Sequence, residues 1–181
     1  MVSIALGGGS IVKEVTGGLR VGPESAGSNP GPACYGLGGK MATISDANMV
    51  LVRLPPEQLL GGNLKLDIEA AQKSISEVGS QLGLDIISTA EQALEVAHFK
   101  MAQAIRELTV ERGLDPREFS ICAFGGAGPL HAAFIAEELE IKKIVIPSSA
   151  GAFSAWGMLQ SDLRHDMTIT YFRKFNEAQT D

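Results

Sequence analysis

The chain has 181 residues, enough for one compact domain or a domain with a small appendage. Its formal net charge of −6 supplies no basic footprint for nucleic acid, and no apolar stretch is long enough to span a bilayer. The first residues lack a basic region that leads into a long apolar segment, so no secretory signal is indicated. We therefore expect a cytoplasmic protein that binds neither nucleic acid nor membrane.

The first quarter of the chain is rich in glycine. Residues 2–6 are apolar and predict a short strand, and a second strand is expected over 11–15. The glycine-rich residues 7–10 then form a turn between the two strands. From 17 to 39 the sequence carries eight glycines and three prolines, which predicts mostly loop held in place by neighbouring segments.

A short helix is predicted over residues 47–52. Ser45 and Asp46 are both suited to cap it, because their side-chain oxygens accept hydrogen bonds from the free amides at a helix start. The helix must end before Pro55, since a residue that precedes proline avoids the helical conformation. Asp46 also lies beside the glycine-rich loop, so an alternative role is to orient water or Mg²⁺ there.

Two longer helices follow. Asp67 is the expected N-cap of the first, whose apolar residues recur every three or four positions until Gly83. The second helix is predicted to open at a capping box, Ser88 to Glu91, and to end at Gly113. Its apolar stripe predicts one buried face, made of Leu94, Ala97, Met101, Ile105 and Leu108.

The most informative stretch is an apolar run that meets three glycines and then a helix-forming segment. Residues 121–124 predict a buried strand, because the run has no polar face. Gly125, Gly126 and Gly128 let the backbone turn and approach a ligand closely, and Pro129 presets the first helical turn. Helix-start amides are unpaired donors with partial positive charge, which suits a nucleotide, phosphate or carboxylate. An ordinary strand-to-helix turn uses the same residue types and stays open as the alternative.

A second apolar run, residues 144–146, follows this helix. The order strand, helix, strand predicts two parallel strands joined by a right-handed crossover, so the fold class is mixed α/β. The small residues 148–151 precede another predicted helix over 152–159. The start of this helix is expected to face the same ligand-binding cleft as the glycine turn at 125–128. Trp156 and Gly157 within that helix predict close packing.

Four segments are expected along the chain. Residues 1–45 form a glycine-rich strand and loop segment, and residues 46–118 form a helical segment. Residues 119–173 hold the strand, loop, helix and strand of the expected ligand site, and their last part, 167–172, alternates as in a strand. Residues 174–181 form a loose tail.

Two common nucleotide motifs are absent from the sequence. A Gly-x-Gly-x-x-Gly fingerprint would begin at Gly126, yet His131 stands in place of the third glycine and no acidic residue follows about twenty positions later. No Gly-x-x-x-x-Gly-Lys-Ser/Thr segment occurs, which excludes a Walker-type phosphate loop.

Several polar residues have two candidate roles. Cys34 and Cys122 lack metal-ligand spacing and are expected to be reduced thiols, with a nucleophile as the alternative for Cys34. Glu24 is either a general base or an anchor for loop amides. His98 and His165 have no spacing that indicates zinc, so no metal site is expected and the catalytic residues stay unassigned.

Five segments of the chain, taken in order, carry a family resemblance: Gly7–Ile11, Leu19–Gly27, Asn29–Gly36, Ser45–Asn48 and Phe124–Ala132. Together they resemble the hydantoinase A / oxoprolinase family, which includes N-methylhydantoinase A, 5-oxoprolinase and subunits of acetone and acetophenone carboxylases. The match covers nearly the whole chain and keeps the family's order. It is therefore far more specific than any single glycine cluster.

The resemblance implies part of an actin-like, or ribonuclease H-like, ATPase lobe. In that fold ATP with Mg²⁺ lies between two lobes and activates a substrate carbonyl oxygen or carboxylate by phosphorylation. Near the phosphates, the resemblance implies amides from Gly8, Gly9 and Ser10, for which a structural hairpin turn is the alternative. At the adenosine end it implies contacts from Gly125, Gly126, Ala127, Gly128 and His131, where packing or capping is an alternative role for His131.

The sequence also departs from the family pattern. The family's phosphate-binding signatures of the form Asp-x-Gly-Gly-Thr occur nowhere in the chain, so the recognised groups that clamp the β and γ phosphates are missing. We therefore expect a carboxy-terminal fragment of the ATPase subunit of a hydantoin or 5-oxoproline hydrolase, inactive on its own. The alternatives are a non-catalytic α/β domain for assembly or anion binding, and a carboxylase subunit of the acetone carboxylase type.

The same resemblance implies partners. These are the missing amino-terminal lobe and a hydantoinase B-type subunit. Because the missing lobe leaves apolar surface uncovered, a homo-oligomer is also expected.

Overall fold

The structure, a computed structural model, describes residues 3–56, 65–162 and 164–170. Its mixed α/β composition confirms the predicted fold class, and no helix in these ranges is long and apolar enough to cross a membrane. The elements in chain order are β1 Ser10–Val15, β2 Gly18–Ser25, η1 Ala33–Tyr35, α1 Ile44–Val50, α2 Ile68–Leu82, α3 Ile86–Val110, η3 Pro116–Glu118, β3 Ile121–Cys122, α4 Gly128–Glu138, β4 Ile144–Val145, η4 Ala150–Ala152 and α5 Phe153–Leu159.

Strands β1 and β2 form an antiparallel hairpin in which Val12 lies opposite Val21. The predicted strand over 11–15 is confirmed, whereas the loop predicted over most of 17–39 is wrong as far as Ser25. Thr16 and Gly17 both have positive φ angles, +52° and +82°, which is the geometry of a two-residue hairpin turn. The high glycine and proline content concealed this turn.

The strand predicted before the glycines is also wrong. Residues 3–6 have no regular secondary structure, and residues 1 and 2 lie outside the described part of the chain. Gly8 instead accepts a hydrogen bond from the Ser45 amide, 2.8 Å, through its carbonyl. The carbonyl of Gly9 accepts from the Ala26 amide, also 2.8 Å. This segment is therefore held by α1 and by the end of β2 rather than by a partner strand.

Helix α1 is fixed by a buried carboxylate. The N-cap is Thr43, two or three residues earlier than the predicted caps Ser45 and Asp46, and Asp46 is the third helical residue of a capping box. Asp46 is fully buried and accepts hydrogen bonds from the Cys34 amide at 2.7 Å, the Ala33 amide at 3.3 Å, and the Thr43 amide and hydroxyl at 2.9 and 2.7 Å. The carboxylate therefore fastens the glycine-rich loop to α1, which supports an anchoring role over a contact with water or Mg²⁺.

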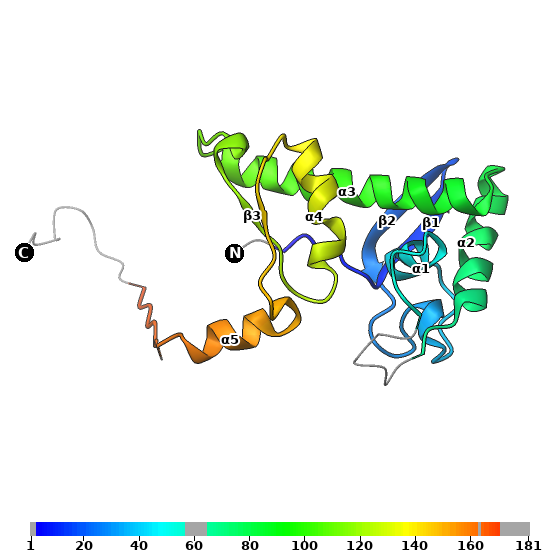
Figure 1. Cartoon of the computed structure of the whole chain (residues 1–181), viewed down its shortest axis with the longest axis horizontal. Helices are drawn as coiled ribbons and strands as arrows, with labels where there is room; N and C mark the ends of the chain where they lie inside the picture. Colours follow the sequence, from blue (N-terminus) through cyan, green and yellow to red (C-terminus); the bar gives the residue numbers. More distant parts are fainter. Residues whose placement is uncertain (1–2, 57–64, 163, 171–181) are drawn as a thin grey trace, which may run out of the picture.

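Helix α2 runs across one end of the longer helix α3, and the two helices pack against each other (Figure 1). The predicted α2 is confirmed, because Asp67 caps its start and Gly83 ends it in the left-handed conformation. Helix α3 begins earlier than predicted. Asp85 is its N-cap and accepts from the Ser88 amide at 2.9 Å, so Ser88 is a partner of the cap and not the cap itself.

Helix α3 joins two hydrophobic clusters. The first cluster includes the hairpin, α1, α2 and the first half of α3 up to Ala97. The second includes Ala102 of α3, the apolar face of α4 and residues of β3 and β4. Figure 1 shows α3 running along the molecule, with the hairpin, α1 and α2 at one end and α4 and β3 at the other.

Strands β3 and β4 are parallel, with Ile121 opposite Ile144, as the sequence predicted. The expectation of a buried strand over 121–124 is wrong in part, because Cys122 and Phe124 are exposed. These two short strands pair only with each other among the described residues. Helix α4 packs against one face of the sheet, whereas Cys122 and Val145 are exposed on the opposite face.

Helix α5 extends away from the rest of the molecule (Figure 1). Close packing of this helix is not observed: Trp156 is 53% exposed, and a Cβ built on Gly157 meets no atom within 4 Å. The strand predicted over 167–172 is absent for residues 167–170. Residues 171–172 and the predicted loose tail lie outside the described part of the chain.

We predict that Asp46→Asn lowers the free energy of unfolding by about 2 to 4 kcal/mol, because an amide group would face backbone donors that now meet a carboxylate. Urea unfolding followed by circular dichroism measures this. Asp85→Asn is the matched control, since Asp85 caps α3 in an exposed position where asparagine caps about equally well. Equal losses in the two variants would contradict the anchoring role of Asp46.

Candidate functional site

The candidate site lies at the edge where β3 and β4 end. Because the strands are parallel, their carboxyl ends meet at one edge, which is where open α/β sheets place ligands. The Gly125 amide donates to the Ala150 carbonyl at 2.8 Å, and the Ala123 amide donates to the Val145 carbonyl at 2.9 Å. These bonds hold two bends side by side: the first bend, residues 124–128, and the second bend, residues 147–152.

The first bend is open. Gly125 has a φ of +86°, a conformation that favours glycine. A Cβ built on Gly125 or Gly126 meets nothing within 4 Å, and one on Gly128 meets only the carbonyl carbon of Ala123 at 3.9 Å. No neighbouring side chain among the described residues therefore fills the space beside these glycines.

The start of α4 adds unpaired donors to this bend. Its N-cap is Ala127, which has no side chain able to bond the first amides, and Pro129 occupies the first turn as predicted. Amides at such a helix start carry partial positive charge and can donate hydrogen bonds to an anionic group. The bend thus combines close backbone approach with free donors.

Aromatic side chains flank the two bends. Phe124 is 46% exposed, and its ring centroid lies 5.3 Å from that of Phe153. The ring of Phe153 in turn stacks on Trp156 at 5.5 Å with an interplanar angle of 14°. They provide flat apolar surface next to the free amides.

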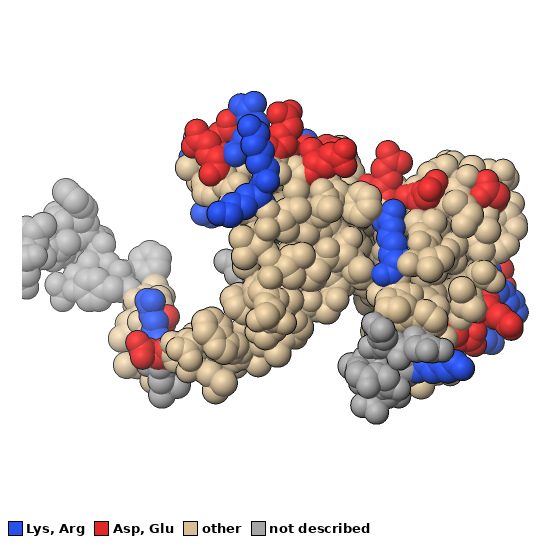
Figure 2. All heavy atoms as spheres, in the orientation of Figure 1, with Lys and Arg blue, Asp and Glu red and all other residues tan. Residues whose placement is uncertain are grey.

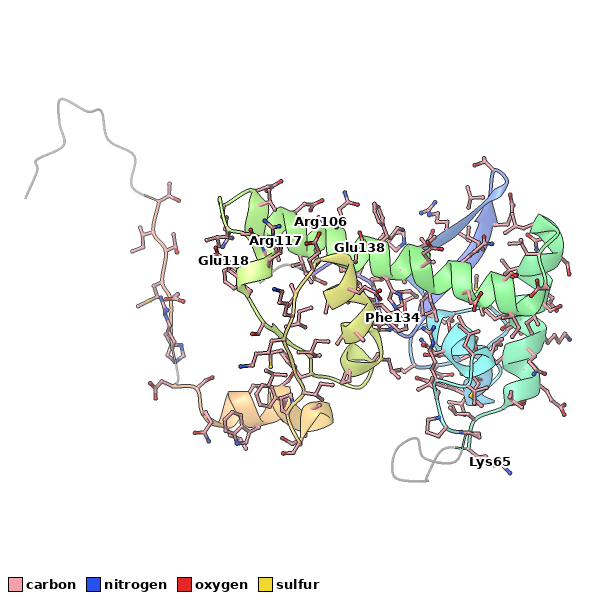
Figure 3. The ribbon with its side chains drawn as sticks, turned by 45° about the horizontal axis from the view of Figure 1, so that its top comes forward. Lys65, Arg106, Arg117, Glu118, Phe134 and Glu138 are labelled. Atoms are coloured by element: carbon pink, nitrogen blue, oxygen red, sulfur yellow. The ribbon has the colours of Figure 1, made fainter. Side chains whose placement is uncertain are left out.

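His131 faces the interior. Its side chain is only 3% exposed, and its Nδ1 lies 3.0 Å from Nε2 of His98 on α3. Figure 3 shows Phe134, one turn further along α4, in the region between α4 and the hairpin end of the molecule. The structure therefore places the His131 side chain in the packing between α3 and α4, which supports the packing role.

The environment of the two histidines disfavours their charged forms. Burial, followed by the neighbouring His131 and the positive charge of Arg53, lowers the pKa of His98 from 6.5 to about 4. Burial and then Arg53 lower the pKa of His131 as well. Both imidazoles are accordingly neutral at pH 7.

The predicted phosphate contact, residues 7–10, is a tight turn in the structure. The Gly7 amide donates to the Ser10 hydroxyl at 2.9 Å, and the Ser10 amide donates to the Gly7 carbonyl at 3.0 Å. A Cβ on Gly8 would lie 2.6 Å from Oγ of Ser45, so a larger residue there would have to displace the Ser45 hydroxyl. No hydrogen bond among the described residues joins this turn to the first bend.

The remaining candidates of the sequence have structural surroundings. Cys34 is a buried free thiol whose pKa is raised mainly by burial, so it is a poor nucleophile. Glu24 forms an ion pair with Lys13 at 2.9 Å and lies 3.6 Å from Arg20. Within the described ranges no three metal-ligating side chains gather, and His165 is exposed.

Sequence reasoning missed a cluster formed by Arg53, His98, His131 and Phe134. His98 and His131 are 33 positions apart and lie on different helices, so no local pattern indicates their contact. A groove of about 1220 Å³ also lies between α3, α4 and the hairpin, away from the two bends. Arg53, His98 and Phe134 line it together with glutamates of α3 and α4.

Comparison with known proteins identifies the family. The hydantoinase/oxoprolinase family model matches residues 1–167, and the chain therefore belongs to this family. An uncharacterized protein of Methanocaldococcus jannaschii is 46% identical over 179 residues, which cover 98% of this chain and 26% of that protein. The chain thus spans about a quarter of the length of this relative.

Two solved structures share the fold. The crystal structure of the ATP-dependent caprolactamase from Pseudomonas jessenii superposes with a TM-score of 0.79 at 40% sequence identity, covering 88% of this chain and 23% of that one. The nucleotide-free structure of acetone carboxylase, an enzyme of ATP-dependent acetone carboxylation, superposes with a TM-score of 0.78 at 31% identity. That match covers 84% of this chain and 22% of the other.

The lowered pKa of His98 predicts a pH dependence of stability. Because the folded-state pKa of about 4 lies below the ordinary 6.5, the unfolded chain binds more protons between these values. The neutral form of His98 therefore contributes fully to folding stability above pH 6.5. This contribution, on the order of 2 kcal/mol, is lost as the pH falls toward 4.

Urea unfolding at pH 7.5, 6, 5 and 4.5 measures this dependence. His98→Gln should flatten the pH profile relative to the wild type, and His165→Gln, at an exposed position, should leave it unchanged. An unaltered slope in His98→Gln would show that His98 binds its proton equally well in both states.

Proposed function

We propose that this chain forms part of the ATP-binding lobe of an ATP-dependent hydrolase of cyclic amides, such as hydantoin or 5-oxoproline. The observation that carries the proposal is the open first bend, whose glycines have no side-chain neighbours and which leads into an uncapped helix. Membership of the hydantoinase/oxoprolinase family and the fold shared with an ATP-dependent caprolactamase support the same conclusion.

In this proposal the backbone of Gly125, Gly126, Ala127 and Gly128 approaches the adenosine end of the nucleotide. The neighbouring aromatic rings, Phe124 among them, supply an apolar surface against which a purine can lie. The side chain of His131 is buried, so in this proposal it supports the bend by packing and does not contact the nucleotide. The amides of Gly7 and Ser10 donate hydrogen bonds within the turn over 7–10. The amides of Gly8 and Gly9 are therefore the candidates for contact with the phosphates.

The residues of this chain fit the sugar and base of ATP better than the Mg²⁺ that accompanies its phosphates. The open bend suits a nucleoside, whereas no cluster of metal-ligating side chains exists among the described residues. ATP, when bound, supplies the phosphoryl group that activates the carbonyl oxygen of a cyclic amide. The carboxylates and clamping groups that this chemistry needs would come from other parts of the subunit, and the chain alone is expected to be inactive.

An exposed apolar surface around α5 is suited to a partner. Figure 2 shows that the surface over α5 and its surroundings is almost free of charged side chains. Apolar residues on this part of the chain are well exposed, with values from 44% to 83%: Phe124, Val145, Ile146, Trp156, Met158 and Leu159. We call these residues the α5 face, and we propose that the amino-terminal lobe of the intact subunit covers it. A hydantoinase B-type subunit is the further partner proposed.

Two other functions are alternatives to this proposal. The fold shared with acetone carboxylase favours a carboxylase subunit as the second candidate. Its nucleotide chemistry would use the same bend, so binding of ADP does not separate it from the hydrolase. Turnover of the intact subunit with 5-oxoproline or with acetone and bicarbonate does. A non-catalytic domain for assembly or anion binding is the third candidate, and a bend that binds phosphate but not adenosine would favour it.

We predict weak binding of ADP at the first bend, with a Kd of about 1 mM, because one lobe supplies only part of the contacts. Amide shifts in a two-dimensional NMR titration measure this and locate the site. Gly126→Val should weaken binding at least about tenfold, since its side chain would enter the open space, while the fold is retained.

The matched control for this titration is Gly18→Val. Gly18 lies at the start of β2, where an added Cβ meets only the Val15 carbonyl at 3.9 Å. The affinity of the Gly18→Val variant for ADP should equal that of the wild type. Shifts confined to residues outside the two bends would overturn the proposed site, and a submicromolar Kd would show that the site is complete without a second lobe.

We also predict a homo-oligomer in solution, formed through the α5 face in the absence of another lobe. Light scattering coupled to size-exclusion chromatography measures the mass. Trp156→Glu should shift the protein to monomer, whereas Phe99→Glu, at a 54% exposed position on α3, should not. A monodisperse wild-type monomer would contradict the prediction.

A further inference from the structure

A compact polar and aromatic cluster joins three segments that are distant in sequence. His98 of α3 stacks on Phe134 of α4 with ring centroids 4.6 Å apart and an interplanar angle of 7°. The guanidinium of Arg53, which follows α1, lies 4.5 Å from the centroid of the same Phe134 ring. Nε2 of His98 lies 3.0 Å from Nδ1 of His131, also on α4. We call these four residues the histidine cluster.

The histidine cluster occupies the boundary between the two hydrophobic clusters. On α3 the first hydrophobic cluster ends at Ala97 and the second begins at Ala102, so His98 lies between them. On α4 the partner is His131, three residues after the helix begins at Gly128. The hydrogen bond between the two imidazoles therefore ties the start of α4, and the bend that leads into it, to α3.

Apolar packing would hold these helices together at lower cost. Nε2 of His131 and one guanidinium nitrogen of Arg53, Nη1, are buried and have no hydrogen-bond partner among the described residues. A buried donor or acceptor left unpaired loses the hydrogen bonds that it makes with water, a cost that an apolar pair of similar size does not carry. What the polar pair adds is direction, because a hydrogen bond fixes the ring orientation of His131 while apolar contact does not.

We propose that His98 is a positioning residue for the first bend. Through its hydrogen bond to His131 it fixes the start of α4, and with it the direction of the free amides in the bend. This inference rests on the proposed function, since the benefit of fixed amides is the binding of a nucleotide. Small displacements of such groups have large effects on binding and reaction, because the contacts depend on distances of about 3 Å.

Two substitutions of His98 separate hydrogen bonding from packing. Leucine fills a similar volume but makes no hydrogen bond. Glutamine places an amide near the position of Nε2, and it can donate to or accept from Nδ1 of His131, whichever tautomer is present. If His98 acts only by packing, leucine preserves the bend at least as well as glutamine; if it acts by positioning, only glutamine preserves it.

The experiment compares the full chain carrying His98→Leu or His98→Gln with the wild type by two-dimensional NMR, first without ligand and then with ADP. We expect His98→Leu to move the amide signals of Gly125–Gly128 and to raise the Kd for ADP about five- to tenfold. We expect His98→Gln to keep both within twofold of the wild type. Unmoved bend signals in His98→Leu, or equal changes in the two variants, would overturn the proposal.

The ligand-free spectra keep this test separate from the proposed function. If the wild type does not bind ADP but His98→Leu alone moves the bend signals, positioning stands and the nucleotide assignment fails. If the wild type binds ADP and His98→Leu leaves affinity and signals unchanged, the nucleotide assignment stands and positioning fails.

A double variant tests the proposal if the single substitution His98→Leu folds poorly. His98→Leu/His131→Leu replaces the polar pair with an apolar one of similar volume. It should fold with a melting temperature at or above that of the wild type and still show moved bend signals. Wild-type bend signals in this double variant would overturn the proposal.

Discussion

The structure depends on one helix that belongs to two hydrophobic clusters. The first half of α3 packs with the hairpin, α1 and α2, and its second half packs with α4 and the short parallel sheet. A single continuous helix of 25 residues fixes the distance and the rotation between these halves. Everything that lies at the edge of the β3–β4 sheet is therefore positioned, through α3, relative to the glycine-rich first part of the chain.

This arrangement explains why the candidate site is open. The β3–β4 sheet has two strands of two residues each, and among the described residues α4, with side chains of α3, packs against one of its faces. The bends at its edge consequently present free amides and aromatic rings without covering side chains. The chain spans about a quarter of its relative and shares its fold with parts of much longer enzymes. In the proposed function, the amino-terminal lobe of the intact subunit would cover this surface.

Sequence reasoning succeeded where the signal is local. The cap at Asp67, the stop at Gly83, the parallel strand order and the glycine bend before Pro129 depend on neighbouring residues, and the structure confirms them. It failed where the outcome depends on distant partners. The burial of Asp46 against loop amides and the contact of His98 with His131 join segments that no local pattern connects. Exposure of Trp156 was likewise unpredictable, because an apolar helix gives the same signal whether its partner is present or lies elsewhere.

We propose above all that the first bend binds the adenosine portion of an adenine nucleotide. A crystal structure of the chain soaked with ADP and Mg²⁺ would test this binding. We expect density for the purine and ribose beside Gly125–Gly128, with the base against the Phe124 side of the bend. Density in the groove between α3 and α4, or a bend closed by side chains with no space for a purine, would contradict it.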